Sequence, residues 1–171
     1  MKPSLGSVLR AHEVPSAGGD TLFANMALAY NRLPDVTKEK IHDCVAVHDI
    51  ARVFASRLNK KPEELHELYP PVEHLVVRTH PETKESVVYV NGAFTSHIKG
   101  MEAKESRRLL DTLYKSTWDP EIQCRFQWQA GSIAFWDNRA CQHFAVSDYF
   151  PAVRVMERVT IAGDKPYFDN R

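Results

Sequence analysis

The sequence predicts a mainly β protein with a few flanking helices, arranged as an antiparallel sandwich or barrel. Three observations support this fold class. Short apolar or alternating runs of strand length recur along the chain, and turn-forming residues such as the Gly18-Gly19 pair separate them. The clearest helical spacing lies in one segment, 101–117, where apolar residues recur at intervals of three and four.

Length and composition restrict the function classes. The 171 residues have the length of one domain, 1–171, and Lys plus Arg equals Asp plus Glu at 22 each, so no global field favours nucleic acid or an anionic membrane. Cys44, Cys124 and Cys141 are widely spaced and are expected to be reduced thiols. No apolar run has the length of a membrane span and no signal pattern is present, so we expect a cytoplasmic protein.

The N-terminal half is predicted to hold two strands, two short helices and then a charged, partly helical insertion. Pro15 and the Gly18-Gly19 pair force a turn after the first strand, and Pro34 interrupts the helical stretch. The predicted strands are 5–14 and 20–25, the helices 26–33 and 36–47, and the insertion 48–71.

The C-terminal half begins with two β-rich runs, 75–79 and 86–90, which the turn HPETKE connects. After the helix at 101–117, the segment 122–129 alternates apolar and polar residues, as expected of a half-buried strand. The turn Ala130-Gly131 should lead it back antiparallel into a second strand, 132–136.

Function is predicted to lie in 131–163, where two strand-like runs are joined by a loop that contains His143. The second run, 154–161, alternates, so Arg154 and Arg158 share a face with Cα atoms about 13 Å apart, close enough to serve one elongated anionic pocket. The pattern alone leaves a plain β-hairpin with surface arginines and a surface histidine equally open.

The sequence WDNRACQHFAVSDYFPAVRVMERVTIAGDKP resembles the C-terminal signature of the taurine/2-oxoglutarate dioxygenase family of non-haem iron enzymes. A histidine follows the WDNR arginine by four residues, an arginine follows this histidine by eleven, and a second arginine follows four further on. The resemblance implies that His143 is the distal iron ligand, that Arg154 binds the far carboxylate of 2-oxoglutarate, and that Arg158 meets an acidic group of the substrate. It narrows the fold to a double-stranded β-helix, a jelly-roll relative.

Three further positions carry expectations from the same resemblance. GGDTLFAN places Thr21 where the family supports the 2-oxoglutarate carboxylate, although a β-branched residue can simply fill a strand. Phe54, and Phe94 within NGAFTSHI, fall where the family has walls of the substrate pocket. For Phe54, a plain core position is equally open. The insertion 48–71 corresponds to a substrate-covering lid. His80 begins a His-X-Glu triplet, but the family carries this turn as RTHPET without a ligand role.

The resemblance implies Fe(II) as cofactor, 2-oxoglutarate and O₂ as cosubstrates, and a small anionic substrate such as taurine or another alkylsulfonate, with release of succinate and CO₂. No nucleic-acid or membrane partner is expected, and a homo-oligomer is compatible with the sequence. In the family, a His-X-Asp pair supplies the other two iron ligands just upstream of the segment matching 3–9, which places it before Met1.

The jelly-roll is therefore expected to be incomplete at its N-terminus, with unpaired strand edges around 5–25. The missing pair is expected within about ten encoded residues upstream. With His143 as its only iron ligand, the chain alone is expected to be inactive. The alternative is a shortened, non-catalytic family member that acts as an anion-binding or subunit-interaction module.

Overall fold

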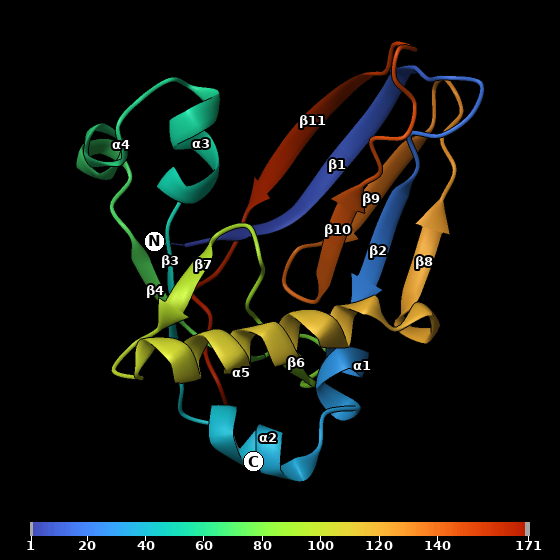
Figure 1. The fold of residues 1–171 in the computed structure, drawn as a ribbon. Helices are drawn as coiled ribbons and strands as arrows, with labels where there is room; N and C mark the ends of the chain where they lie inside the picture. Colours follow the sequence, from blue (N-terminus) through green and yellow to red (C-terminus); the bar gives the residue numbers. More distant parts are fainter. Residues whose placement is uncertain (1, 170–171) are drawn as a thin grey trace.

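The structure is a computed structural model, and it describes residues 2–169. Within these residues, two three-stranded antiparallel sheets pack face to face at the upper right of Figure 1. Aromatic rings meet between them, because Phe23 and His143 of one sheet contact Trp136 of the other. A smaller sheet and several helices lie beside and below this sandwich. The predicted class, mainly β with flanking helices, is confirmed.

The first main sheet has the strand order β11-β1-β9, with β1 at its centre. Val8 of β1 lies opposite Val159 on one side and Phe135 on the other. The strands are β1 (Ser4–Glu13), β9 (Ile133–Asp137) and β11 (Val155–Ala162).

The second main sheet has the order β10-β2-β8, with β2 at its centre. Phe23 of β2 lies opposite His143 on one side and Cys124 on the other. The strands are β2 (Thr21–Asn25), β8 (Gln123–Phe126) and β10 (Cys141–Ala145).

Two predictions about strand pairing were wrong. The segment 5–25 does not present unpaired edges, because β1 and β2 each have a partner on both sides. Nor do 122–129 and 132–136 form a hairpin, because β8 and β9 belong to opposite sheets and the turn between them crosses the sandwich. Alternation revealed the strands but not their partners, since pairing depends on contacts distant in sequence.

The third sheet has the order β4-β3-β7, and β5 and β6 form a separate antiparallel pair. The hairpin turn predicted at HPETKE is confirmed between β5 and β6. The predicted helix 36–47 is only half correct, because its second half is the central strand of this sheet. The elements are α2 (Asp35–Ile41), β3 (Val45–His48), β4 (Val72–Leu75), β5 (Val77–Thr79), β6 (Ser86–Val88) and β7 (Thr95–Ile98).

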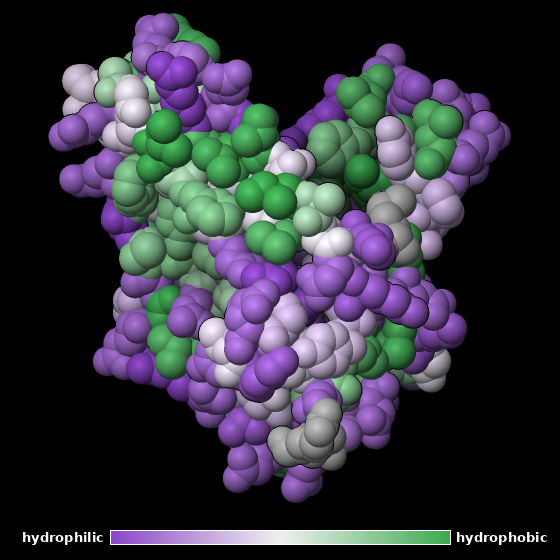
Figure 2. Space-filling view, turned by 180° about the vertical axis from the view of Figure 1, so that it is seen from behind, coloured by the Kyte–Doolittle hydropathy of each residue, from purple (hydrophilic) through white to green (hydrophobic). Residues whose placement is uncertain are grey.

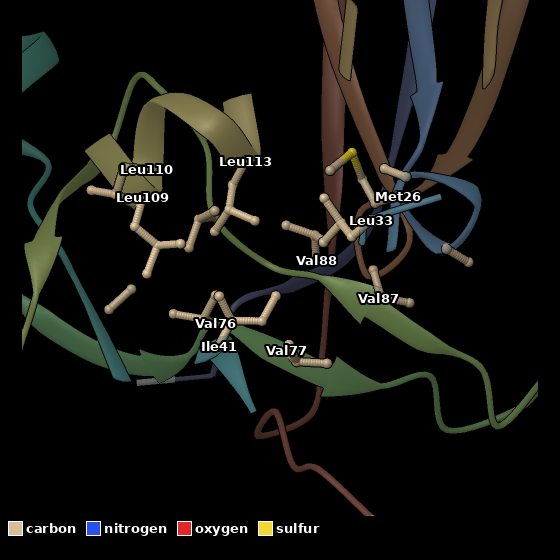
Figure 3. Close-up of a cluster of buried hydrophobic side chains, with 14 of the residues drawn as sticks. Met26, Leu33, Ile41, Val76, Val77, Val87, Val88, Leu109, Leu110 and Leu113 are labelled. Atoms are coloured by element: carbon tan, nitrogen blue, oxygen red, sulfur yellow. The ribbon is translucent and has the colours of Figure 1, made fainter. Parts of the chain in front are cut away.

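The main apolar core lies beneath helix α5 (Ala103–Lys115) and not between the two main sheets. Figure 3 shows Leu109, Leu110 and Leu113 pointing from α5 toward Val76 and Ile41. The Glu102 side chain caps the helix by accepting hydrogen bonds from the first-turn amides.

The remaining helices frame the sheets. Helices α3 and α4 form a separate lobe across from β11 in Figure 1, within the predicted insertion 48–71. None of the helices in residues 2–169 is long and apolar enough to cross a membrane. The bounds are α1 (Met26–Asn31), α3 (Ala51–Arg57), α4 (Pro62–Leu68), and the 3₁₀ turns η1 (Ser116–Trp118) and η2 (Pro120–Ile122).

Apolar side chains gather on the outer face of the first main sheet. Figure 2, seen from behind, shows this patch at upper left, over β11, β1 and β9. We call it the outer patch, and its exposed members are Ile133, Phe135, Val155, Val159 and Ile161.

Candidate functional site

His143 lies on strand β10 and not in the loop that the sequence predicted. Its ring is 4.8 Å from that of Trp136 and 6.4 Å from that of Phe23, measured between centroids. Burial, and then the nearby Arg158 charge, lower the pKa of His143. A neutral imidazole is the form that binds a metal ion, so these neighbours favour the ligand state.

The WDNR segment fixes the turn that leads from β9 into β10. The Trp136 indole donates to Asn138 Oδ1 at 2.8 Å, and the Asn138 amide donates to Ser7 Oγ at 2.9 Å and Ser4 Oγ at 3.0 Å. The turn is therefore attached to β1, and the ring that packs on His143 is held in one orientation.

Asp137 and Arg139 extend this turn into a charged network. Arg139 donates to Asp137 through Nε and Nη2 and to Glu82 at 3.1 Å. Burial alone would raise the pKa of the Asp137 carboxyl, but hydrogen bonds from Arg139 and His80 hold this pKa at about 2. His80 Nε2 contacts Asp137 Oδ2 at 3.1 Å, while Nδ1 accepts from the Glu82 and Thr83 amides. Both His80 nitrogens are engaged, which agrees with the expectation that it is not a metal ligand.

Thr21 and Arg154 meet at Trp128. The Trp128 indole donates to Thr21 Oγ1 at 3.0 Å, and the Arg154 guanidinium carbon lies 5.8 Å from the Trp128 ring centre. Arg154 Nε and Nη2 are buried and have no hydrogen-bond partner in the described residues. A Cβ on Gly19 would lie 3.1 Å from Arg154 Cδ, so this glycine leaves room for the arginine.

Arg154 and Arg158 occupy different environments. Arg154 comes one residue before β11, so the alternation that predicted a shared face begins only after it. Arg158 lies within β11, opposite Leu9, and its side chain is exposed. Its positive charge, after burial, contributes to the lowered pKa of His143.

Phe54 and Phe94 are brought together, on the α3 side of the molecule. Their rings are nearly parallel, at 13°, with centroids 6.4 Å apart. The Asp49 amide donates to the Phe94 carbonyl at 2.8 Å, and the Arg57 guanidinium lies 5.9 Å from the Phe54 ring centre. No ring contact joins this pair to the His143 cluster among the described residues.

Sequence reasoning missed the supporting aromatic residues. Trp128 lies in the alternating segment 122–129 but was not given a role, although it donates to Thr21 and lies under Arg154. Trp136 and Phe23 were not given a role, although both pack on His143. A buried tryptophan usually finds a partner for its N–H, and this is the signal that could have pointed to Trp128.

The described residues fit 2-oxoglutarate and iron to different degrees. Two buried, unpartnered donors on Arg154 suit a carboxylate, which accepts bidentate hydrogen bonds. For iron, residues 2–169 contain no group of three His, Cys, Asp or Glu side chains that could hold a metal ion. Cys141 is no substitute, because burial raises the pKa of its thiol to about 12. The residues present do not complete an iron site.

The candidate site therefore combines, in one β sandwich, a histidine of lowered pKa on β10 and an arginine beside Trp128 with two buried, unpartnered donors among the described residues. The family described as taurine catabolism dioxygenase TauD, TfdA family matches residues 2–160. The chain belongs to this family.

Two named relatives show the similarity in more detail. The chain is 37% identical over 166 residues to an alkylsulfatase of Acinetobacter baylyi, and 37% identical over 168 residues to an alpha-ketoglutarate-dependent sulfate ester dioxygenase of Pseudomonas putida. These matches cover 92% and 94% of this chain but 52% and 56% of the relatives. The chain therefore spans about half the length of these curated relatives.

Solved structures confirm the jelly-roll fold. A taurine dioxygenase from Burkholderia xenovorans superposes with a TM-score of 0.84 at 38% identity, covering 97% of this chain and 56% of that one. AAD-2, in complex with Mn(II) and N-oxalylglycine, superposes with a TM-score of 0.86 at 32% identity, covering 96% and 66%. Fe(II) and 2-oxoglutarate, the expected cofactor and cosubstrate, are thus confirmed for the family.

Proposed function

We propose that this chain forms the 2-oxoglutarate-binding and distal-histidine part of an Fe(II)/2-oxoglutarate-dependent dioxygenase that hydroxylates a small anionic substrate. The observation that carries the proposal is the Arg154 guanidinium, which lies over Trp128 with two buried donors that lack a partner among residues 2–169. An unpaired buried cation is costly, and a carboxylate ligand would remove that cost.

Each residue of the site has a separate role in this proposal. Arg154 holds the far carboxylate of 2-oxoglutarate as a bidentate fork, and the Thr21 hydroxyl donates to the same carboxylate. His143 supplies one neutral imidazole ligand, oriented by Trp136 and Phe23. The reaction of the family couples decarboxylation of 2-oxoglutarate, with release of succinate and CO₂, to oxidation of the substrate by O₂.

The substrate is proposed to be a sulfate ester or an alkylsulfonate such as taurine. The names of the two relatives at 37% identity refer to alkylsulfate and sulfate ester chemistry, which supports an anionic headgroup. Arg158 would bind that headgroup, and Phe54 and Phe94 would form apolar walls. The segment 48–71, with its two short helices, would act as the lid of a single domain.

Two broader expectations accompany this proposal. The reaction would take place in the cytoplasm, which suits the free thiols of Cys44, Cys124 and Cys141. A homo-oligomer stays compatible with the outer patch.

Binding and turnover together test the proposal. Calorimetric titration of the chain with N-oxalylglycine, without metal and with Mn(II), should show binding that Arg154→Ala removes. Because residues 2–169 do not complete an iron site, turnover is measured on the chain extended by the His-X-Asp segment that the family resemblance implies. Incubation of that extended form with Fe(II), 2-oxoglutarate, O₂ and a panel of sulfate esters and sulfonates, with succinate as the readout, then identifies the substrate. Failure of the chain to bind N-oxalylglycine under either condition would refute the cosubstrate assignment.

The second candidate is a non-catalytic module that binds anions or another subunit. It is favoured by the single proposed ligand, His143, since residues 2–169 hold no group of three metal-binding side chains. In that case N-oxalylglycine binding would be weak and indifferent to Mn(II), and succinate would not form with any member of the panel.

A further inference from the structure

Trp128 connects the two residues that would hold the 2-oxoglutarate carboxylate. Only 8% of it is exposed, and it follows strand β8 by two positions. Its indole N–H donates to Thr21 Oγ1 at 3.0 Å, and its ring lies 5.8 Å from the Arg154 guanidinium carbon. Phe126 packs edge-on against the same ring, with centroids 4.7 Å apart. One buried side chain therefore contacts both the hydroxyl and the cation.

We propose that Trp128 is a positioning residue that sets the direction of the Thr21 hydroxyl proton and the plane of the Arg154 guanidinium for a ligand carboxylate. This inference rests on the proposed function. The inference adds to the proposed function one residue, Trp128, whose atoms need not touch the ligand.

The hydrogen-bond inventory of the hydroxyl supports the first half of the inference. A threonine hydroxyl has one proton and two acceptor lone pairs, whereas an indole N–H can only donate. Because Trp128 donates to Thr21 Oγ1, the hydroxyl proton must point elsewhere. Thr21 is 1% exposed, so water cannot readily accept that proton, and a carboxylate is a suitable acceptor.

The geometry of the arginine supports the second half. A guanidinium over an aromatic face gains cation–π attraction, and the ring limits the tilt of its planar fork. Gly19 and Trp128 border Arg154, and its Nε and Nη2 are left as buried, unpartnered donors. These two atoms form one edge of the fork, the arrangement that meets both oxygens of a carboxylate.

The test measures N-oxalylglycine binding by calorimetry, with and without Mn(II), for a set of matched variants. Trp128→Phe keeps an aromatic face but loses the N–H, and we expect about 3- to 10-fold weaker binding, the range for one net hydrogen bond. Trp128→Leu also loses the face and should bind more weakly still. Trp118→Phe changes an exposed tryptophan and should bind as the wild type does.

A double-mutant cycle separates positioning from general destabilisation. In the Thr21→Val background the hydroxyl is already absent, so adding Trp128→Phe should weaken binding by much less than it does alone. Thr21→Ser keeps the hydroxyl and should restore the full effect of Trp128→Phe. Equal effects of Trp128→Phe in all three backgrounds would show that it acts through the fold alone and would overturn the proposal.

A second measurement applies if Trp128→Phe does not fold. The three tryptophans give three indole signals in a ¹⁵N-labelled chain, and N-oxalylglycine should shift the Trp128 signal but not that of Trp118. An unmoved Trp128 signal in a chain that binds the ligand would overturn the proposal.

Two results distinguish this inference from the proposed function. If the wild type binds and Arg154→Ala does not, but Trp128→Phe binds as the wild type does, only the role of Trp128 is lost. If the wild type itself does not bind N-oxalylglycine, the proposed function fails, and the role of Trp128 fails with it.

Discussion

Arg154 and Arg158 are only four positions apart, but their surroundings differ. Arg154 presents buried donors without a partner between the main sheets, whereas Arg158 is exposed on β11. Buried donors without a partner favour a ligand that supplies matching acceptors, while an exposed guanidinium is already solvated. We therefore propose separate roles for the two residues.

Arg154→Ala should weaken 2-oxoglutarate binding by about 2 kcal/mol or more, because a charge-assisted bidentate contact is lost. Arg154→Lys should recover only part of this, since an ammonium lacks the planar fork. Arg158→Ala should leave N-oxalylglycine binding unchanged and impair the sulfonate or sulfate ester instead. Titration of each variant with both ligands measures the difference, and equal losses for both ligands in both variants would contradict the assignment.

His48 should make the stability of the chain depend on pH. Burial, and then the neighbouring His74, lower the pKa of His48 to about 4 in the folded chain, against ~6.5 when unfolded. Below ~6.5 the unfolded chain takes up a proton that the folded chain does not. The free energy of unfolding should therefore fall by on the order of 2 kcal/mol as the pH drops from 7 to 5.

Urea unfolding of His48→Gln at pH 7 and pH 5 measures this contribution. The variant should lose much of the pH dependence, since the titrating imidazole is gone. His97→Gln, on an exposed position of β7, is the matched control and should retain it. The same pH dependence in the wild type and in His48→Gln would contradict the prediction.

At the scale of elements, one carboxylate joins the two helices of the proposed lid. Asp49 Oδ1 accepts from the Ala51 amide at 2.8 Å, at the start of α3, and lies 2.9 Å from His66 Nε2 on α4. Neither helix exceeds seven residues, so each depends on such contacts more than on its own propensity.

Asp49→Ala should loosen this pair without unfolding the protein. Hydrogen exchange across 51–68 should accelerate by several-fold, as expected for the loss of about 1 kcal/mol of capping and bridging interaction. Exchange in α5 should not change. Asp43→Ala removes a carboxylate that is 93% exposed and serves as the control. Acceleration that spreads equally to α5 would mean that Asp49 stabilises the whole fold rather than the lid.

The sequence predicted the positions of strands and helices better than it predicted their partners and surroundings. Alternation located β8 and β11, and spacing of three and four located α5, because these patterns are local consequences of side-chain direction. β1 and β2 were predicted from their apolar residues and from the turn between them. Residues 45–47 of strand β3 were predicted as helix, because a four-residue strand has no period long enough to distinguish it. His143 was predicted in a loop, because CQHFA becomes a strand only through pairing with β2.

The candidate site residues could be identified only from the family resemblance. The residues that hold them in place could be identified only from the three-dimensional structure. The spacing of His143, Arg154 and Arg158 defined candidates, but only the fold brings Thr21 to Trp128, 107 positions away. The contact between Trp136 and His143 crosses from one sheet to the other. No local pattern carries that information.

At the scale of the whole molecule, much apolar surface is exposed on one side of the sandwich. Phe135, Ile133 and Val159 of the outer patch are each about 60% exposed, and nearly every residue of β11 is exposed. Exposed apolar faces and free strand edges favour association between copies. This chain, studied alone, should therefore be poorly stable as a monomer and should associate with other copies.

Sedimentation velocity should show association that increases with chain concentration, and melting should be broad. Val159→Lys should shift the distribution toward monomer, because a charge at the centre of the outer patch opposes contact between copies. Val36→Lys, at a 71% exposed position on α2, should not. A sharp, cooperative melt from a monodisperse monomer would contradict this prediction.

The pairing of β1 determines when the sandwich can assemble during synthesis. β1 is translated before its partners, β9 and β11, and the Asn138 amide donates to Ser7 Oγ across 131 positions. The third sheet, the β5–β6 pair and α5 can form before the partner strands of β1 and β2 have been synthesised. Such distant pairing makes folding slow. The candidate site, which draws on both main sheets, should be the last region to form as the chain leaves the ribosome.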